Sequence, residues 1–499
     1  MQWLLAAIAV FAFGAGMAQA VPDQLSAEIV AKLEQLDSGL TAADPAAPVF
    51  PQDAITELGL ADLMGPLTPS ADVLDWAEAP TEPLAVERLN MRLMMIMLSQ
   101  AYGSDGNGTV MSAQTEPGLD ALVIRKGRVN LTDLRRILQE NRLQRVAEAG
   151  PLVLKVPLVI WAGASLNLAP GDVLQLSRPD GAFVVNFGQL QIKGATIEMV
   201  GDANVGSPGF IPFVTTADSG TAQVQDARII GLGFGKTMKF SGFAIMHNAL
   251  QTADSASFIT GTLFRDLVTV SISADWDVTL RGNHFRDSRG PSLIVNRTRG
   301  ARIVSNLFSG KMPTNAIILE EGSGRGRIEG NIVLGGDYSG IVVRGGSSSA
   351  TVAHNIVWDR EGGGIALSKS ECGVIHDNIV IDNGQKGIEV RFSPNAEVRG
   401  NTILSNHSAG IWVSDQPKGA QTFVRENVLV ANGSGLAGAK GESILLDGND
   451  FTKQFPQFLS GDLTPQSDTI ARNLRGLTSF VLSAAGTSAP TPALSNCTD

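Results

Sequence analysis

The stretch HDNIVIDNGQKGIEV, residues 376–390, contains one unit of the repeat that decides the fold. An Asn opens a short apolar strand, an Asn-Gly pair makes a turn, and Gly-Ile opens the next strand. The Gly-Ile steps recur at Gly340, Gly364, Gly387 and Gly410, with gaps of 24, 23 and 23 residues. A near-fixed period of this length, filled by short β-strands without a helical segment, is typical of a β-solenoid. We expect each glycine at a bend that needs a permissive backbone, and the following Ile in the core.

Asparagines that precede a strand recur with the same period. Neighbouring members of this set are 22 to 26 residues apart. Equivalent positions in successive turns of a solenoid lie about 4.8 Å apart, so each side-chain amide can donate to the next. We therefore expect an inward Asn ladder, and a shorter second ladder five residues later in three of the turns. The first set is Asn283, Asn306, Asn331, Asn355, Asn378, Asn401, Asn427 and Asn449, and the second is Asn383, Asn406 and Asn432.

These repeats predict an all-β protein: a right-handed parallel β-helix with a helical N-terminal module and a C-terminal cap. The first residues form an apolar run that closes with Ala18-Gln19-Ala20, which indicates a signal peptide rather than the alternative, a short membrane anchor. The expected segments are a signal peptide at 1–20, the helical module at 21–115, the β-helix at 119–450, the cap at 451–485 and a disordered tail at 486–499.

The N-terminal module is predicted from two stretches with helical spacing, residues 23–40 and 82–100. The second stretch contains a methionine cluster, which we interpret as adaptable core packing rather than a soft-metal site. A short capped helix is expected in the residues NLTDLRRILQ, 130–139. The methionines are Met91, Met94, Met95 and Met97.

Charge and composition narrow the range of partners and compartments. The net charge is −11, and residues 21–120 hold 16 acidic and 3 basic residues, or −13. Residues 281–440 hold 18 basic and 14 acidic residues, or +4, so only this later part attracts a polyanion locally. Without a basic stripe that contains aromatics, nucleic-acid binding is not expected. No later stretch is long and apolar enough to span a bilayer, so we expect a periplasmic or secreted protein.

Cysteines and histidines give no sign of a cofactor or metal. The two cysteines, Cys372 and Cys497, do not make a disulfide scaffold, and a bridge between them stays open. None of the five histidines has metal-ligand spacing to a Cys or another His. His354 and His376 stand one and two positions before a ladder Asn, so we expect them to face opposite ways as turn residues.

Candidate site residues come from the outward positions of one sheet, because side chains fill a solenoid core and leave only outer faces for ligands. Two and four residues after each Gly-Ile glycine, or after the equivalent residue of another turn, side chains are expected to face outward. An Arg there can neutralise a uronate carboxylate, a Glu can accept a proton, and a Trp can stack on a sugar ring. The alternative is a solvated face on which Glu389 and Arg391 pair with each other. The candidate catalytic residues are Glu320, Arg344, Glu389 and Arg391, and the candidate substrate-binding residues are Asn296, Ser368 and Trp412.

Residues 154–201, followed by GFIPFV and DARIIGLGFG, resemble the exported mannuronan C5-epimerases of alginate-producing bacteria. The shared features are the strand led by Pro157, the Leu174–Leu176 strand, the turn at 181–186 and the strand at 210–213. The similarity covers about residues 150–440. It implies a signal peptide, a right-handed parallel β-helix of the pectin lyase type, and chemistry on an acidic polysaccharide.

The chain departs from that family at its catalytic step. The family has Asp-Pro-His-Asp directly after a Gly-Ile opening, with Asp and His at the two outward positions, and this chain contains no such sequence. The family's catalytic residues therefore cannot be assigned to positions here. Epimerisation at C5 removes a proton beside a carboxylate and returns one from the other face, whereas a lyase shares only the first step.

Three functional hypotheses remain open. The first is an exported C5-epimerase-like or lyase-like protein acting on a uronate polymer. The second is a non-catalytic β-helix that binds or guides an exopolysaccharide beside the export machinery. The third is a periplasmic accessory factor for metal-enzyme assembly, against which the absence of an outward His or Met cluster argues.

Overall fold

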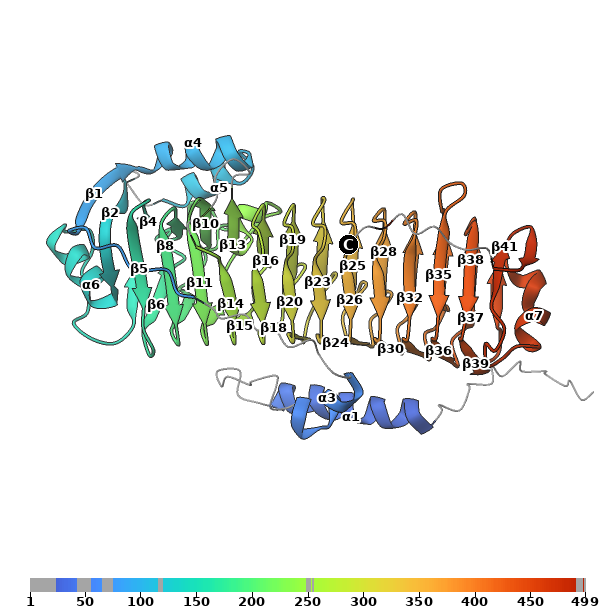
Figure 1. Ribbon diagram of the computed structural model, residues 1–499. Coiled ribbons are helices and arrows are strands. Elements are labelled where there is room, and N and C mark those ends of the chain that lie inside the picture. Colours follow the sequence, from blue (N-terminus) through green and yellow to red (C-terminus); the bar gives the residue numbers. More distant parts are fainter. Residues whose placement is uncertain are drawn as a thin grey trace, which may run out of the picture.

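The protein is a long parallel β-helix in which three sheets run along one axis (Figure 1). We name the sheets A, B and C in the order in which each turn of the chain enters them. The predicted right-handed parallel β-helix is confirmed. The predicted signal peptide lies outside the part of the chain that this computed structural model describes. The described residues are 24–42, 55–64, 75–114, 120–247, 253, 255–490 and 497.

Sheet A carries the strands that the Gly-Ile steps predict. Its strands pair in parallel from turn to turn, with Ile341 opposite Ile365 and Ile388 opposite Ile411. These isoleucines point into the core, as expected. The strands are β4 (Leu158–Ile160), β7 (Val184–Asn186), β10 (Val214–Asp218), β13 (Gly242–His247), β16 (Thr269–Ser273), β19 (Leu293–Asn296), β22 (Ile317–Glu320), β25 (Ile341–Arg344), β28 (Ile365–Ser368), β31 (Ile388–Arg391), β34 (Ala409–Ser414), β37 (Ser434–Ala439) and β40 (Leu459–Gly461).

Sheet B shares its first strand with sheet A, because β2 (Asp120–Asn130) bends from one sheet into the other. Its last two strands run antiparallel and help to close the coil. The strands are β5 (Ala164–Leu168), β8 (Gln189–Lys193), β11 (Thr221–Gln225), β14 (Phe258–Thr260), β17 (Thr279–Arg281), β20 (Arg302–Val304), β23 (Arg327–Glu329), β26 (Thr351–Ala353), β29 (Val374–His376), β32 (Ala396–Arg399), β35 (Gln421–Arg425), β38 (Ser443–Asp447), β41 (Phe480–Ser483) and β42 (Gly486–Ser488).

Sheet C holds 13 strands, one for each turn of the coil. Its inward side chains include Phe264, Phe285 and Phe308, which stack with ring centroids 5.2 and 4.6 Å apart. The strands are β3 (Leu152–Leu154), β6 (Val173–Ser177), β9 (Thr196–Val200), β12 (Arg228–Ile230), β15 (Leu263–Arg265), β18 (His284–Arg286), β21 (Leu307–Ser309), β24 (Ile332–Leu334), β27 (Ile356–Trp358), β30 (Ile379–Ile381), β33 (Thr402–Leu404), β36 (Val428–Val430) and β39 (Asp450–Lys453).

Both predicted Asn ladders are present and fully buried. Asn355 donates from its side-chain nitrogen to the Asn378 oxygen at 2.9 Å and to the Ile328 carbonyl at 2.8 Å. Its own oxygen accepts from the backbone and side chain of Asn331, both at 2.9 Å. The second ladder runs from Asn383 to Asn432 and ends on Gln454. Each buried amide thus finds its partners in the neighbouring turns.

The Gly-Ile glycines have a different cause from the one predicted. None of the four has a positive φ. A Cβ atom on Gly364 would lie 2.3 Å from Cγ1 of Val380, and one on Gly387 would lie 2.8 Å from the Asn406 amide nitrogen. Close packing at the corner, rather than a bend in the backbone, requires glycine here. The prediction of a conformational role is therefore wrong.

The N-terminal residues form a cover over the coil rather than a bundle of their own. α1 (Gln24–Ala42) and α3 (Leu60–Met64) lie against sheet C, where Leu33 and Leu36 join a buried cluster with Ile356 and Ile381 (Figure 1). α4 (Met91–Tyr102) and α5 (Asn107–Ser112) lie over the first turns of sheet A. The apolar outer surface of these sheets explains why the helices pack there.

Part of this module is not helical. Ala85–Asn90 form β1, which pairs antiparallel with β2, so the predicted helix over 82–100 is wrong in its first half. The edge of β2 supplies the hydrogen-bonding partner, and the Asn90 side chain then caps α4. Met91, Met94 and Met95 are buried as predicted, whereas Met97 is exposed.

Both ends of the coil are closed. α6 (Leu131–Glu140) begins with an Asn130–Asp133 capping box and buries its apolar side over the first turn, as the sequence predicts. At the other end η2 (Thr464–Gln466) and α7 (Ser467–Ala471) cover the core with Leu463 and Ile470. The coil continues past the predicted end at residue 450, because β40 still stacks on β37.

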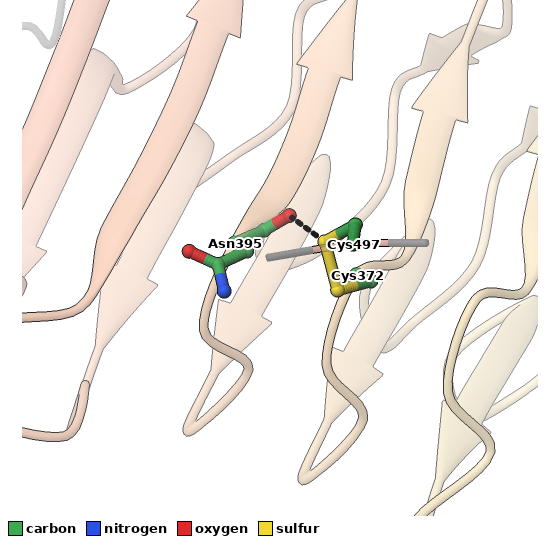
Figure 2. The surroundings of a disulfide bond; sticks show 3 residues. All are labelled: Cys372, Asn395 and Cys497. Atoms are coloured by element: carbon green, nitrogen blue, oxygen red, sulfur yellow. Dashed lines mark hydrogen bonds between the residues drawn. A yellow bond between two sulfur atoms is a disulfide. The ribbon is translucent and has the colours of Figure 1, made fainter. Parts of the chain in front are cut away.

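The tail predicted to be disordered is fixed at two places. Gly486–Ser488 form β42, and Cys497 forms a disulfide with Cys372 in the turn between β28 and β29 (Figure 2). The two Cα atoms are 5.6 Å apart, across 125 residues of sequence. The prediction of disorder is wrong at these described positions, because strand pairing and a covalent bond hold them.

The Asn ladder yields the first prediction. Asn355→Ala should lower the free energy of unfolding by about 3 kcal/mol, because it leaves several buried groups without partners. Asn315→Ala is the matched control, since that partly buried amide donates only to the Ser339 carbonyl at 3.0 Å, and it should cost under about 1 kcal/mol. Guanidinium unfolding measures both. Equal losses for the two variants would contradict a stabilising ladder.

The disulfide yields the second prediction. The Cys372→Ser/Cys497→Ser variant should lose up to about 5 kcal/mol of stability, because a long closed loop restricts the unfolded chain. Guanidinium unfolding of this variant should match that of the wild type in reducing agent. If neither the double substitution nor the reducing agent shifts the unfolding midpoint, the disulfide does not contribute to stability.

Candidate functional site

Among the described residues, no helix covers the outer side of sheet A beyond its first turns. Figure 1 shows α4 and α5 over the early strands, while β19 to β34 carry none of the described helices. Side chains two and four positions after each Gly-Ile glycine, or after its equivalents Ser292 and Ala316, face outward here. Strand pairing places the fourth position of each strand in one line. The line is Asn296, Glu320, Arg344, Ser368, Arg391 and Ser414, as the sequence predicts, and we call it the sheet A column.

Glu320 and Arg344 form an ion pair across two successive turns. Nε and Nη2 of Arg344 lie 2.8 and 2.5 Å from Oε2 of Glu320. The Arg344 side chain is 48% exposed and that of Glu320 is 16% exposed. The guanidinium is therefore open to solvent on one side while its carboxylate partner is largely covered. The remaining N–H groups of this guanidinium can donate hydrogen bonds to a second carboxylate, supplied by a ligand.

Glu389 and Arg391 do not pair with each other, so the predicted pair within their strand is wrong. Glu389 Oε1 lies 2.8 Å from Nζ of Lys386, and Nε of Arg391 lies 3.0 Å from Oδ2 of Asp415. Residues two apart on a strand share a face but lie about 6.6 Å apart along it, whereas Lys386 and Asp415, which lie outside this strand, come closer. The sequence gives no period that would have singled out Lys386 or Asp415.

The remaining candidates divide into covered and open positions. Asn296 is buried, and its oxygen accepts from Nε of Arg297 at 3.0 Å. Trp412 lies beside Glu389 in the next turn, and the Lys386 ammonium sits 4.9 Å from its ring centroid. Ser368 is half-buried between the two arginines of the column. Trp412 therefore offers less free ring surface to a sugar than the sequence suggests.

Exposed aromatic rings at both edges of sheet A were not predicted. Trp276 and Phe392, 58% and 50% exposed, lie in turns that leave sheet A for sheet B. Tyr338 and Phe455, 60% and 58% exposed, lie in turns that enter sheet A from sheet C. All the strongly exposed aromatic rings of the described chain thus border this one sheet. These residues lie in turns and do not recur with the period of the strands, so the repeat pattern of the sequence does not identify them.

A buried His–Asp pair lies at the covered end of sheet A. His247 Nδ1 is 3.3 Å from Oδ1 of Asp275, and its Nε2 is 2.9 Å from the Gly220 carbonyl. Burial by itself lowers the pKa of His247, but the hydrogen bond and charge of Asp275 and the Gly220 carbonyl outweigh burial and raise it. The pair is too deeply buried to touch a polymer, so it serves to hold the turns together.

Tyr102 fixes α4 beside this pair. Its hydroxyl donates to the Met246 carbonyl and accepts from the Asp218 backbone nitrogen at 3.1 Å. Burial raises the pKa of Tyr102 to about 12, so the phenol stays protonated at neutral pH. Tyr102 is therefore a structural hydrogen-bonding group here and not a base.

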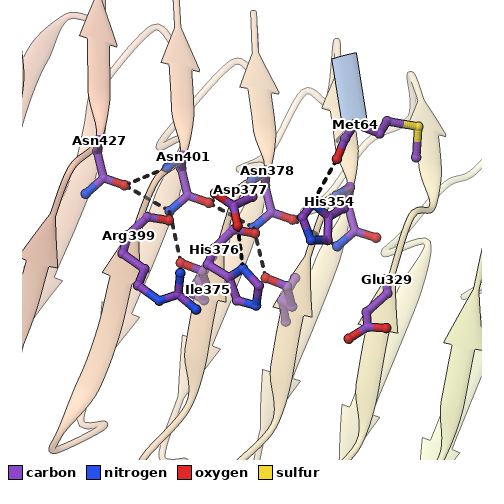
Figure 3. Close-up of polar contacts among 12 residues, drawn as sticks. Met64, Glu329, His354, Ile375, His376, Asp377, Asn378, Arg399, Asn401 and Asn427 are labelled. Atoms are coloured by element: carbon purple, nitrogen blue, oxygen red, sulfur yellow. Dashed lines mark hydrogen bonds and ion pairs between the residues drawn. The ribbon is translucent and has the colours of Figure 1, made fainter. Parts of the chain in front are cut away.

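His354 and His376 face each other, against the prediction that they point opposite ways. Their ring centroids are 5.4 Å apart with an interplanar angle of 82° (Figure 3). His354 has a φ of 55°, and this left-handed backbone turns its side chain back toward sheet B. Counting positions before the ladder Asn assumed an extended backbone, which explains the error.

Comparison with known proteins agrees with this architecture. A family model described as "Right handed beta helix region" matches residues 268–429. The mannuronan C5-epimerase of Pseudomonas fluorescens is 23% identical over 337 residues, which are 63% of this chain and 61% of that protein. The chain is similar to the mannuronan C5-epimerases. This epimerase-like β-helix spans 61% of the length of that curated relative.

Solved structures show the same fold. The periplasmic alginate epimerase AlgG is 20% identical with a TM-score of 0.61, and the match covers 84% of this chain and 98% of that one. A mutant form of AlgG is 19% identical, also with a TM-score of 0.61, and the match covers 79% of this chain and 98% of that one. In the described part of the epimerase-like β-helix, no helix is long and apolar enough to cross a membrane.

The buried pair yields the third prediction. Because the folded-state pKa of His247 is raised, the pair contributes stability that is fully present below about pH 6.5 and is lost as the pH rises through that pKa. The stability difference between wild type and His247→Gln/Asp275→Asn should therefore shrink from pH 6 to pH 9 in urea unfolding. His407→Gln, at an exposed histidine, is the control. A difference that stays constant with pH would contradict the charged pair.

Proposed function

We propose that this chain is an exported protein that binds an acidic, uronate-containing polysaccharide along the sheet A column and acts there as a C5-epimerase. The observation that carries the proposal is the Glu320–Arg344 pair, a half-exposed guanidinium with a covered carboxylate beside it. These two residues stand at fourth positions of successive turns, where the resemblance places the family's catalytic histidine. The epimerase and alginate names of the relatives support the same polymer class.

The column suits a polymer because it carries two arginines along the axis of the coil. Arg344 and Arg391 stand two turns apart with Ser368 between them, so one extended chain can contact both cations. Arginine binds carboxylates through two parallel hydrogen bonds, which fixes both position and orientation of a uronate. The exposed rings of Trp276, Tyr338 and Phe392 border the same sheet and offer apolar surface to sugar rings.

The chemistry assigns a role to each member of the pair. A uronate carboxylate that takes the open side of Arg344 has its charge neutralised, which makes the adjacent C5 proton easier to remove. Arg344 then contacts two carboxylates, that of Glu320 and that of the uronate. Glu320 is the carboxylate of the column that lies nearest to the bound uronate, so it is the candidate base. A carboxylate gains base strength when water is excluded from it, and a bound polymer covers this side of the sheet. If the intermediate formed by removal of the C5 proton loses its C4 substituent instead of regaining a proton, the reaction is that of a lyase.

A second function rests on a separate observation. Within sheet A, none of the outward positions of the described strands from β16 to β37 carries a histidine, and both Glu320 and Glu389 are already ion-paired. A face with cations, aromatic edges and no free base is that of a non-catalytic β-helix that binds or guides an exopolysaccharide. In that case the polysaccharide-export machinery is the expected partner.

Export itself has independent support. Disulfides persist in oxidising compartments and are rare in the reducing cytosol. The Cys372–Cys497 bond fits the periplasmic or secreted location that residues 1–20 predict. The AlgG relative is itself periplasmic.

The fourth prediction tests this function with uronan polymers in deuterated water. Proton NMR should show deuterium entering at C5 without the ultraviolet absorbance of unsaturated ends. Arg344→Ala should reduce binding or turnover about ten- to hundredfold, because a charge-assisted hydrogen bond contributes about 1.5–3 kcal/mol. Its stability should change by about 1 kcal/mol or less, since the guanidinium is half-exposed and water can take its place beside Glu320.

Arg425→Ala is the matched control, because Arg425 pairs across turns with Glu397 at 2.9 Å on sheet B instead of sheet A. It should leave binding and turnover unchanged. New unsaturated ends would indicate a lyase, and calorimetric binding without either signal would indicate the guide. Absence of binding, or equal losses for Arg344→Ala and Arg425→Ala, would overturn the sheet A site.

A further inference from the structure

A second cluster of chemically active side chains lies on another side of the coil, at the corner between sheets B and C. His354 and Asp377 occupy the same turn position in successive turns, with φ values of 55° and 54°. His376 stands next to Asp377 at the end of β29, so three possible metal ligands come together (Figure 3). None of these residues belongs to the sheet A column.

Outer hydrogen bonds orient both imidazoles. His354 Nδ1 lies 2.8 Å from the Met64 carbonyl, which can only accept, so Nδ1 carries a proton and Nε2 is the ring nitrogen left for a metal ion. His376 Nδ1 lies 2.8 Å from Oδ2 of Asp377, a contact that a shared cation can replace. A backbone carbonyl behind a ligating histidine is the arrangement that holds metal ligands in many proteins.

The neighbouring turns leave room at this corner. Gly330 and Gly400 hold the same turn position before His354 and after Asp377, and both have positive φ. At this turn position itself, the turn before His354 and the turn after Asp377 therefore carry no side chain. Along sheet B, Glu329 and Arg399 stand two turns before and one turn after His376, so opposite charges flank the cluster.

We propose that His354, His376 and Asp377 bind one divalent transition-metal ion such as Zn²⁺. One ligand atom from each residue lies within 4.8 Å of the others, so small side-chain rotations bring the three to metal-ligand distances. Two imidazoles and a carboxylate suit Zn²⁺ and its neighbours better than Ca²⁺ or Mg²⁺, which prefer oxygen ligands. This site is independent of the proposed polysaccharide chemistry.

The position of the site suggests what the ion does. Met64 ends α3, and its carbonyl binds the ligand His354 directly. An ion that fixes His354 also fixes the hydrogen bond to α3, and through it the helices that cover sheet C. Metal binding should therefore stabilise the attachment of the N-terminal cover to the coil.

The fifth prediction is a calorimetric titration of the full mature chain, without a histidine tag and after chelator treatment, with ZnCl₂. One ion should bind per chain, and His354→Gln, His376→Gln and Asp377→Asn should each weaken binding by about tenfold or more. Zn²⁺ should also raise the melting temperature of the wild type and not that of these variants. His407→Gln is the matched control, because His407 sits 3.4 Å from Asp382 without a second histidine close by among the described residues.

Melting of each variant in chelator, compared with wild type, separates a lost ligand from a lost fold. Asp377→Asn keeps the size of the side chain, so it tests the site even if a histidine variant unfolds. Absence of saturable Zn²⁺ binding by the wild type would overturn the proposal. The proposal would also be overturned if folded His354→Gln and His376→Gln bound Zn²⁺ with wild-type affinity, or if His407→Gln lost as much Zn²⁺ affinity as they do.

Discussion

The fold depends on the stacking of buried side-chain amides along the coil axis. An amide buried without partners is destabilising, and the only partners available at the corner are the chain segments one turn away. The Asn283–Asn449 ladder meets this requirement only if each turn returns to the same place. From residue 283 to residue 449, the ladder therefore helps to fix the register of the strands on either side of it. Once the register is fixed, the core, the outer columns and the corners follow.

The same register explains where function can reside. Because inward positions form a continuous apolar core, polar chemistry is confined to outer columns and to corners. On sheet A the column lines up Glu320, Arg344 and Arg391 from separate turns, so residues far apart in sequence become neighbours. At the B–C corner the same stacking sets His354 above Asp377. One geometric rule thus produces both the sheet A column and the cluster of His354, His376 and Asp377.

The helices that cover the coil come from distant parts of the sequence, and their positions do not follow from the stacking of its turns. α1 and α3 bury the apolar outer side of sheet C, and α4 and α5 bury the start of sheet A. The Cys372–Cys497 bond returns the end of the chain to the middle of the coil. In the described part of the chain, these helices leave sheet A beyond β16 without a helical cover.

The sequence by itself determined the coil, because period, Asn spacing and strand alternation are local properties repeated many times. It also placed Glu320, Arg344 and Arg391 in one column, since the side-chain period of two is fixed by strand geometry. Only the tertiary structure decided the pairing of Glu389 with Lys386, the facing of His354 and His376, and the role of Gly364. Those outcomes depend on left-handed turn residues and on distances between turns of the coil, which no local pattern encodes.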